Sequence, residues 1–130
     1  MKLIKTPETY TLTEMVKEEN LASTVKSGSL DVLATPTLAA WFEYAACKLL
    51  EGYLEDEETT VGTLLELHHN APTTLGDTVK IEITLTEQNG RELVFEASAF
   101  DSAGEVAKCS HKRFIVYKTK FMDKAKSRRV

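Results

Sequence analysis

Cysteine and long apolar runs are both scarce in this 130-residue sequence. Its two cysteines, Cys47 and Cys109, have no CxxC-type spacing, so no metal or redox site is indicated and buried free thiols are expected. The first residues lack the apolar core of a signal peptide, and no apolar run approaches the roughly 20 residues that cross a bilayer. We therefore expect a cytoplasmic protein without membrane contacts.

Several motifs of common enzyme classes are also missing. The sequence contains no GxGxxG, no P-loop, no HExxH and no GxSxG. These motifs build dinucleotide sites, phosphate cradles, zinc sites and nucleophile elbows, respectively. Dinucleotide chemistry, phosphoryl transfer by a P-loop and zinc hydrolysis are therefore not supported.

The net charge of the chain is unevenly placed along it. Residues 118–130 hold six Lys or Arg and one Asp, which gives this segment a net charge of +5. Because the whole chain has a net charge of −4, residues 1–117 have a net charge of −9. This basic tail could attract the phosphates of a ligand, or it could be a frayed, solvated terminus, which is the simpler interpretation. The acidic body argues against a nucleic-acid-binding face, because phosphate contacts dominate such binding.

Apolar patterning predicts one long helix and an antiparallel sheet. Thr35 is the predicted N-cap and Pro36 the first residue of a helix that continues over 37–54 and is apolar on every side, so we expect it to be buried. Residues 14–34 are predicted to be an irregular loop with a helical turn near 14–20. Alternating segments predict strands at residues 8–13, 60–69, 78–87, 92–100 and 105–117.

The connections between these strands predict the fold class. Asn89-Gly90 is a strong hairpin signal, because these residues tolerate the positive φ of a tight turn. Consecutive hairpins imply an antiparallel meander, and this sheet must cover the apolar helix. The sequence thus predicts a single α+β domain over residues 1–130.

Glu43 stands out because the window from Leu38 to Cys47 has no other charge. Its neighbours four residues away are Ala39 and Cys47, so no local cation pairs with it. A buried carboxylate has its pKa raised or finds a specific partner. A catalytic carboxylate is one explanation, and a side chain that reaches the edge or completes a structural hydrogen bond is the other.

His69 is a second candidate by strand parity. In the strand 60–69, alternation places Val61, Thr63, Leu65, Leu67 and His69 on one face, while His68 faces water. Alone, His69 is explained as a satisfied core histidine. Because it faces a helix with an unpaired Glu43, the two together indicate a site better than either alone.

Four further residues have both structural and functional explanations. The Thr35 hydroxyl is a cap, but it also lies at a helix N-terminus, where backbone amides favour developing negative charge. Gly62 either permits close backbone approach or relieves a bulge. His111 and Arg113 share one face of the last strand with Cys109 and Ile115, and a structural ion pair or edge exposure is the simpler account of both.

Taken together, these segments resemble the fluoroacetyl-CoA thioesterase-like family of hot-dog proteins over residues 8–117. The motifs that carry the resemblance are Leu33-Ala34-Thr35-Pro36, Glu43, Val61-Gly62-Thr63, His69, Ala71-Pro72-Thr73, Gly76 and Ser110-His111-Lys112-Arg113-Phe114. The resemblance implies a hot-dog fold, a dimer and hydrolysis of acyl-CoA thioesters. It further implies that Thr35, Glu43 and His69 are catalytic and that Gly62 and Arg113 contribute to the site.

Two departures from the family pattern bear on specificity. Ser29 occupies the position of a gating Phe in the fluoroacetyl-specific enzyme, and Lys112 replaces the Glu of the family's His-Glu-Arg. The resemblance therefore implies an acyl-CoA thioesterase for short or medium acyl groups, with Ser29 in an open substrate pocket and without fluoroacetyl specificity.

The remaining expectations concern the mechanism and the partners. Coenzyme A is part of the substrate, so no separate cofactor or metal is expected, and the assembly is expected to be a homodimer or a dimer of dimers. Covalent attack by Thr35 or Glu43 and base-activated water both remain open. The alternative function is a hot-dog protein that binds acyl-CoA or a related ligand without turning it over; an acyl-CoA hydratase on this fold is less favoured.

Overall fold

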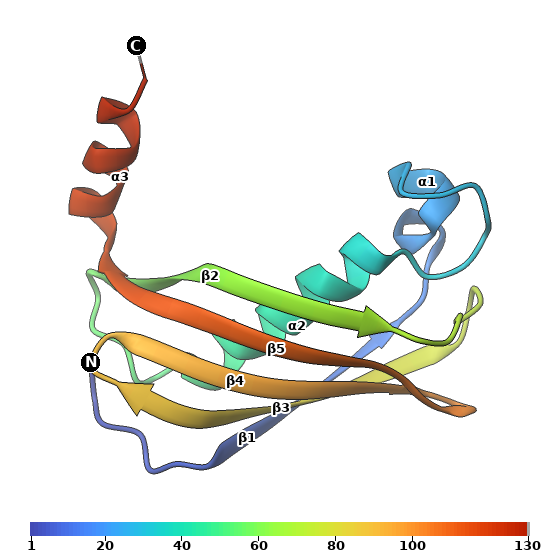
Figure 1. The fold of residues 1–130 in the computed structure, drawn as a ribbon, viewed down its shortest axis with the longest axis horizontal. Coiled ribbons are helices and arrows are strands. Elements are labelled where there is room, and N and C mark those ends of the chain that lie inside the picture. Colours follow the sequence, from blue (N-terminus) through green and yellow to red (C-terminus); the bar gives the residue numbers. More distant parts are fainter. Residues whose placement is uncertain (130) are drawn as a thin grey trace.

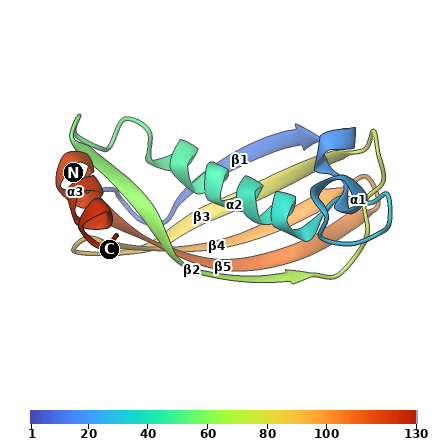
Figure 2. The same cartoon turned by 90° about the horizontal axis from the view of Figure 1, so that it is seen from above.

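A five-stranded antiparallel sheet curves around one long helix in the computed structural model, which describes residues 1–129 (Figure 1). The strand order is β1-β3-β4-β5-β2. Figure 2 shows α2 lying along one face of this sheet, with α1 and α3 at its opposite ends. The elements are β1 (Glu8–Met15), the short 3₁₀ helix η1 (Glu18–Asn20), α1 (Ala22–Val25), α2 (Thr35–Leu50), β2 (Glu58–His69), β3 (Thr78–Asn89), β4 (Glu92–Asp101), β5 (Gly104–Tyr117) and α3 (Lys118–Ser127).

The helix α2 buries one side only. Its core side presents Leu38, Phe42, Ala45, Ala46, Leu49 and Leu50 to the inner face of the sheet. On the opposite side, Ala40, Tyr44 and Cys47 are exposed, because the sheet of one chain covers a single face. The prediction of a helix buried on every side is therefore wrong for the chain by itself.

The two cysteine thiols differ in their exposure to solvent. Cys109 lies on the inner face of β5, where burial raises its pKa to about 12. The prediction of a buried thiol is confirmed for Cys109 and wrong for Cys47, which lies on the uncovered side of α2.

The start of α2 differs from the prediction by one residue. Ala34 is the N-cap and Thr35 is the first helical residue, so Pro36 follows it. The predicted N-cap role of Thr35 is wrong, because no side chain caps this end of the helix. The Thr35 hydroxyl is consequently available for a different hydrogen bond.

The predicted meander is only partly correct. Strands β3, β4 and β5 form consecutive hairpins, and Gly90 adopts a φ of +61° in the turn between β3 and β4. However, β2 pairs with β5 and not with β3, and β1 covers the other edge of β3. Residues 70–77 connect β2 to β3 and are too many for a tight turn. The two strands are therefore not neighbours: β2 forms one edge of the sheet, and β3 lies beside β1 near the other edge.

A bulge interrupts β2 between Gly62 and Leu64. Gly62 lies opposite Arg113, whereas Leu65 lies opposite His111. Because a bulge adds one residue, the alternation of faces shifts by one at this point. Gly62 therefore shares the inner face with Leu65 and His69, and the prediction that Val61 and Thr63 do so is wrong.

The basic C-terminal segment is helical. Residues Lys118–Ser127 form α3, which projects from the end of β5 with every side chain partly or fully exposed (Figure 1). A frayed terminus is therefore not what the structure shows for these residues. None of the helices within residues 1–129 is long and apolar enough to span a membrane.

Candidate active site

Thr35 and His69 meet at one end of the molecule. The first residue of α2 and the last residue of β2 lie side by side, and Thr35 Oγ1 is 2.8 Å from His69 Nδ1. The local sequence explains this contact. Thr35 is not needed as a cap, and inward parity after the bulge directs His69 toward the helix.

The imidazole of His69 has one nitrogen without a partner. Its Nε2 is buried and makes no hydrogen bond within the described chain. Burial lowers the pKa of His69, and the Ala71 backbone offsets this effect in part. A lowered pKa favours the neutral imidazole, which can accept a proton from a hydroxyl.

A cavity of about 280 Å³ lies beside this pair, beneath the segment that leads into α2. Its walls are formed by Ala22, Ser27, Val32, Leu33, Thr35, His69, Asn70, Ala71 and Pro72. Ser29 lies in the same loop but is exposed and does not line the cavity. From that loop, Ser27, Val32 and Leu33 line the cavity beside the Thr35–His69 pair.

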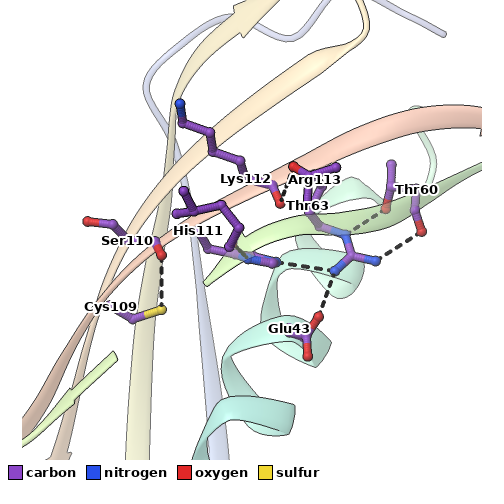
Figure 3. Close-up of polar contacts among 9 residues, drawn as sticks. Glu43, Thr60, Thr63, Cys109, Ser110, His111, Lys112 and Arg113 are labelled. Carbon is purple, nitrogen blue, oxygen red and sulfur yellow. Dashed lines mark hydrogen bonds and ion pairs between the residues drawn. The ribbon is translucent and has the colours of Figure 1, made fainter. Parts of the chain in front are cut away.

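Glu43 finds its partner on the sheet. Its carboxylate Oε2 lies 3.5 Å from Arg113 Nη1, and its side chain remains 45% exposed (Figure 3). The sequence predicted that Glu43 lacks a local cation and needs a specific partner, and Arg113 of β5 is that partner. A helix carboxylate and a strand guanidinium, 70 residues apart in sequence, form this pair.

The Arg113 guanidinium is buried and almost fully hydrogen bonded. Its Nε donates to Thr60 Oγ1 at 2.8 Å and its Nη2 to the Thr60 carbonyl at 2.9 Å. Nη1 lies 3.2 Å from His111 Nε2 as well as near Glu43 (Figure 3). Of the two sequence-based accounts, the ion pair is confirmed for Arg113, whereas edge exposure is wrong for both His111 and Arg113, because β2 pairs with the edge of β5.

Gly62 permits the close approach of these groups. A Cβ atom on Gly62 would lie 2.8 Å from Glu43 Oε2 and 3.5 Å from Arg113 Nη1. Both of the sequence-based explanations of Gly62 therefore apply, since it also opens the bulge. A small cavity of about 180 Å³ adjoins it, lined by Glu43, Gly62, Thr63, Leu64, Leu65 and His111.

The predicted catalytic trio is divided within one chain. Thr35 contacts His69, whereas Glu43 lies eight residues further along α2, which is about 12 Å at 1.5 Å per residue. Glu43 belongs instead with Gly62, His111 and Arg113. Two polar clusters therefore exist, one at the helix start and one at its middle.

Sequence reasoning missed His111. It was assigned a structural role or an exposed edge position, yet it is 1% exposed and contacts the Glu43–Arg113 pair through Arg113. Its alternation with the apolar residues Cys109 and Ile115 was the available signal for burial. His68, by contrast, is exposed and lies 3.4 Å from Glu66, which confirms its predicted outward direction.

A larger hollow of about 490 Å³ lies on the outer face of the sheet, away from both clusters. Its lining includes three carboxylates, from Glu66, Glu82 and Glu96. These negatively charged side chains repel phosphate groups. Among residues 1–129, no group of three His, Cys, Asp or Glu side chains is arranged to hold a metal ion.

The fold places the protein in the class of hot-dog proteins, which includes thioesterases. It matches the solved structure of the fluoroacetyl-CoA thioesterase FlK with a TM-score of 0.92 at 25% identity, covering 97% of this chain and 98% of that chain. A thioesterase-superfamily protein from Thermus thermophilus gives a TM-score of 0.88 at 21% identity, over 98% and 97% of the two chains. The predicted α+β hot-dog fold is confirmed.

The sequence comparisons then define the family. The profile of the fluoroacetyl-CoA-specific thioesterases matches residues 16–119. A fluoroacetyl-CoA thioesterase from Streptantibioticus cattleyicolor is 31% identical over 98 residues, which cover 75% of this chain and 70% of that protein. The chain belongs to the fluoroacetyl-CoA-specific thioesterase family. This confirms the resemblance, while the roles of the individual site residues stay predictions.

The close approach at Gly62 gives a direct test of the geometry. In a Gly62→Ala variant, the new Cβ should push the Glu43 carboxylate away from Arg113, because the two atoms cannot remain 2.8 Å apart. The displaced group is the flexible end of a half-exposed side chain, so we expect the free energy of unfolding to fall by less than ~1 kcal/mol. A crystal structure and urea denaturation measure these two effects.

Gly28→Ala is the matched control, because its Cβ would make only an ordinary 3.4 Å contact with Ala22. It should leave the Glu43–Arg113 pair in place. If the pair also stays unchanged in Gly62→Ala, the arrangement of these residues is wrong.

Proposed function

We propose that this protein is a cytoplasmic acyl-CoA thioesterase that hydrolyses a range of short or medium acyl groups. The observation that carries the proposal is the 2.8 Å contact between Thr35 Oγ1 and His69 Nδ1 beside a cavity of about 280 Å³. A hydroxyl in contact with a neutral imidazole is the arrangement that activates an oxygen nucleophile. Membership of the family supports a thioester as the bond that is broken.

The reaction adds water across the thioester. Attack of an oxygen on the carbonyl carbon forms a C–O bond, and the C–S bond then breaks. Where the attacking oxygen is the Thr35 hydroxyl, the imidazole of His69 accepts its proton and returns it to the leaving thiolate of coenzyme A. The products are a carboxylic acid and free coenzyme A, and the proposal needs no cofactor or metal.

The identity of the attacking oxygen leaves three routes. If Thr35 attacks, an acyl ester forms on its hydroxyl and water releases it in a second step. If water attacks, a carboxylate acts as the base, and Glu43 is the candidate because Arg113 fixes its direction. The Glu43 carboxylate itself is a third candidate nucleophile, and an acyl anhydride would be its intermediate.

Contact between the two polar clusters requires a second copy of the chain. β2 is an edge strand, and Leu64 and Leu65 on it are exposed, as is Tyr44 on the uncovered side of α2. Edge strands with apolar neighbours are suited to pairing across a two-fold axis. With the extra residue of the bulge counted, a two-fold axis at Glu66 would set Gly62 of one copy opposite His69 of the other, both on the inner face. Glu43 would then face the Thr35–His69 pair.

The basic residues of α3 support a ligand with phosphate groups. Lys120 and Lys124 line a hollow of about 400 Å³ together with Arg91, whose guanidinium lies 4.5 Å from the Tyr117 ring centre. Exposed cations of this kind attract the phosphates of coenzyme A, and salt screens the attraction beyond about 10 Å at 0.1 M.

The first prediction of the proposal concerns the acid–base groups. Glu43→Gln and His69→Asn should each lower kcat by about two orders of magnitude or more, because each removes a positioned proton acceptor. Steady-state hydrolysis of acyl-CoA, followed by thiol release, measures this. His68→Asn is the control and should have nearly normal activity, since His68 faces solvent. A damaging His68 change with a harmless His69 change would contradict the strand register.

The second prediction concerns assembly. Light scattering at micromolar concentration should give twice the 14.5 kDa chain mass, since β2 and the outer side of α2 expose apolar groups. The charged outer face of the sheet, with Glu66, Glu82 and Glu96, favours this dimer over stacking of two dimers. A charge at the edge, as in Leu64→Lys, should yield monomers and abolish turnover. An active monomer would contradict the shared site.

The third prediction concerns the substrate. Ser29, which stands where the family resemblance implies a bulky gate, is a small exposed residue that does not line the cavity beside Thr35 and His69. In an open pocket, apolar contacts distinguish acyl groups by only about 1–3 kcal/mol per methylene. We therefore expect hydrolysis of acetyl-, fluoroacetyl-, butyryl- and arylacetyl-CoA, with little preference for fluoroacetyl-CoA over acetyl-CoA when kcat/KM is measured on one preparation. A preference for fluoroacetyl-CoA over acetyl-CoA of ~10⁴-fold would exclude the open pocket. Binding of these esters without hydrolysis would instead indicate a non-catalytic binding protein.

A further inference from the structure

His111 is buried in the middle of the sheet, on the inner face of β5. It is 1% exposed and lies opposite Leu65 of β2. On its other side the ring is tilted against Phe95 of β4, with ring centres 5.9 Å apart. A polar ring in such surroundings needs hydrogen bonds at both nitrogens, because an unpaired buried donor or acceptor costs about 1–3 kcal/mol.

The partners of His111 fix its tautomer. Nδ1 lies 2.8 Å from the Leu64 carbonyl oxygen, which can only accept, so Nδ1 carries a proton and donates it. Nε2 lies 3.2 Å from Arg113 Nη1, which can only donate, so Nε2 is unprotonated and accepts. Burial lowers the pKa of His111, as is consistent with a neutral ring.

The same hydrogen bond fixes the direction of Arg113. An Nη nitrogen carries two hydrogens, and on Nη1 one of them points to His111 and the other toward Glu43 Oε2 at 3.5 Å. Thr60 holds the opposite side of the guanidinium. Without an acceptor at the position of Nε2, Nη1 would lose one of its two partners and the guanidinium could tilt away from Glu43.

We propose that His111 is a positioning residue of the thioesterase site, which acts by holding Arg113 so that Arg113 orients the Glu43 carboxylate beside Gly62. The inference rests on the proposed thioesterase function. It adds a third member to the Glu43–Arg113 pair and links that pair to the β2 bulge through the Leu64 carbonyl. His111 itself need not touch the substrate.

Two isosteric substitutions separate this role from simple packing. The amide oxygen of a Gln can occupy the place of Nε2 and accept from Arg113, whereas the amide nitrogen of an Asn can occupy the place of Nδ1 and donate to Leu64. His111→Asn should lower kcat by about 10²-fold with KM little changed, as expected when a reacting group is misplaced. His111→Gln should recover at least about tenfold of this loss.

A double substitution tests whether the effect passes through Glu43. In a Glu43→Gln background, His111→Asn should cost little further activity, because residues that act as a unit are not additive. Equal losses of kcat in His111→Gln and His111→Asn would show that His111 serves packing alone. A full additional loss of kcat in the double variant would show the same, and either result would overturn the proposal.

A measurement on the unaltered protein needs neither folding of a variant nor turnover. The ring ¹⁵N shifts of His111 at neutral pH should show a protonated Nδ1 and an unprotonated Nε2. The opposite tautomer or a charged ring would overturn the link to Arg113, even if the kinetics agreed. If no thioester is hydrolysed, the proposed function fails, while the tautomer still decides whether His111 holds Arg113.

Discussion

The buried guanidinium of Arg113 is the constraint on which the middle of the molecule depends. A charge removed from water is tolerated only when it is paired and its donors are satisfied. Thr60, His111 and Glu43 supply these partners from two strands and the helix. Each partner is held in turn, so the position of α2 over the sheet, the pairing of β2 with β5 and the direction of Glu43 are coupled.

The bulge in β2 makes this arrangement possible. It places Gly62 on the face of β2 that is directed toward the helix. Because Gly62 has no side chain, Glu43 has room to approach the strand. The bulge also brings the Leu64 carbonyl to His111 and sets the parity that directs His69 inward. One extra residue therefore serves both polar clusters, although they lie about 12 Å apart along α2.

Much of the site could be predicted from the sequence, because its signals were local. An isolated charge in an apolar helix indicated Glu43, and alternation indicated that His69 faces inward and His68 outward. The partner of Glu43 could not be found in this way, since Arg113 lies 70 residues away and on a different element. His111 was missed for the same reason: a histidine among apolar neighbours has no sequence signal for the tautomer that its partners impose.

The sequence by itself determined the α+β class, the long helix and the hairpins of β3, β4 and β5, because apolar periodicity and turn residues act over a few neighbours. Only the tertiary structure decided that β2 pairs with β5 at the far edge, because strand order depends on contacts distant in sequence. It also decided which side of α2 is covered and that Thr35 contacts His69 in place of capping the helix. These outcomes follow from packing one sheet against one helix face, a condition that no short segment contains.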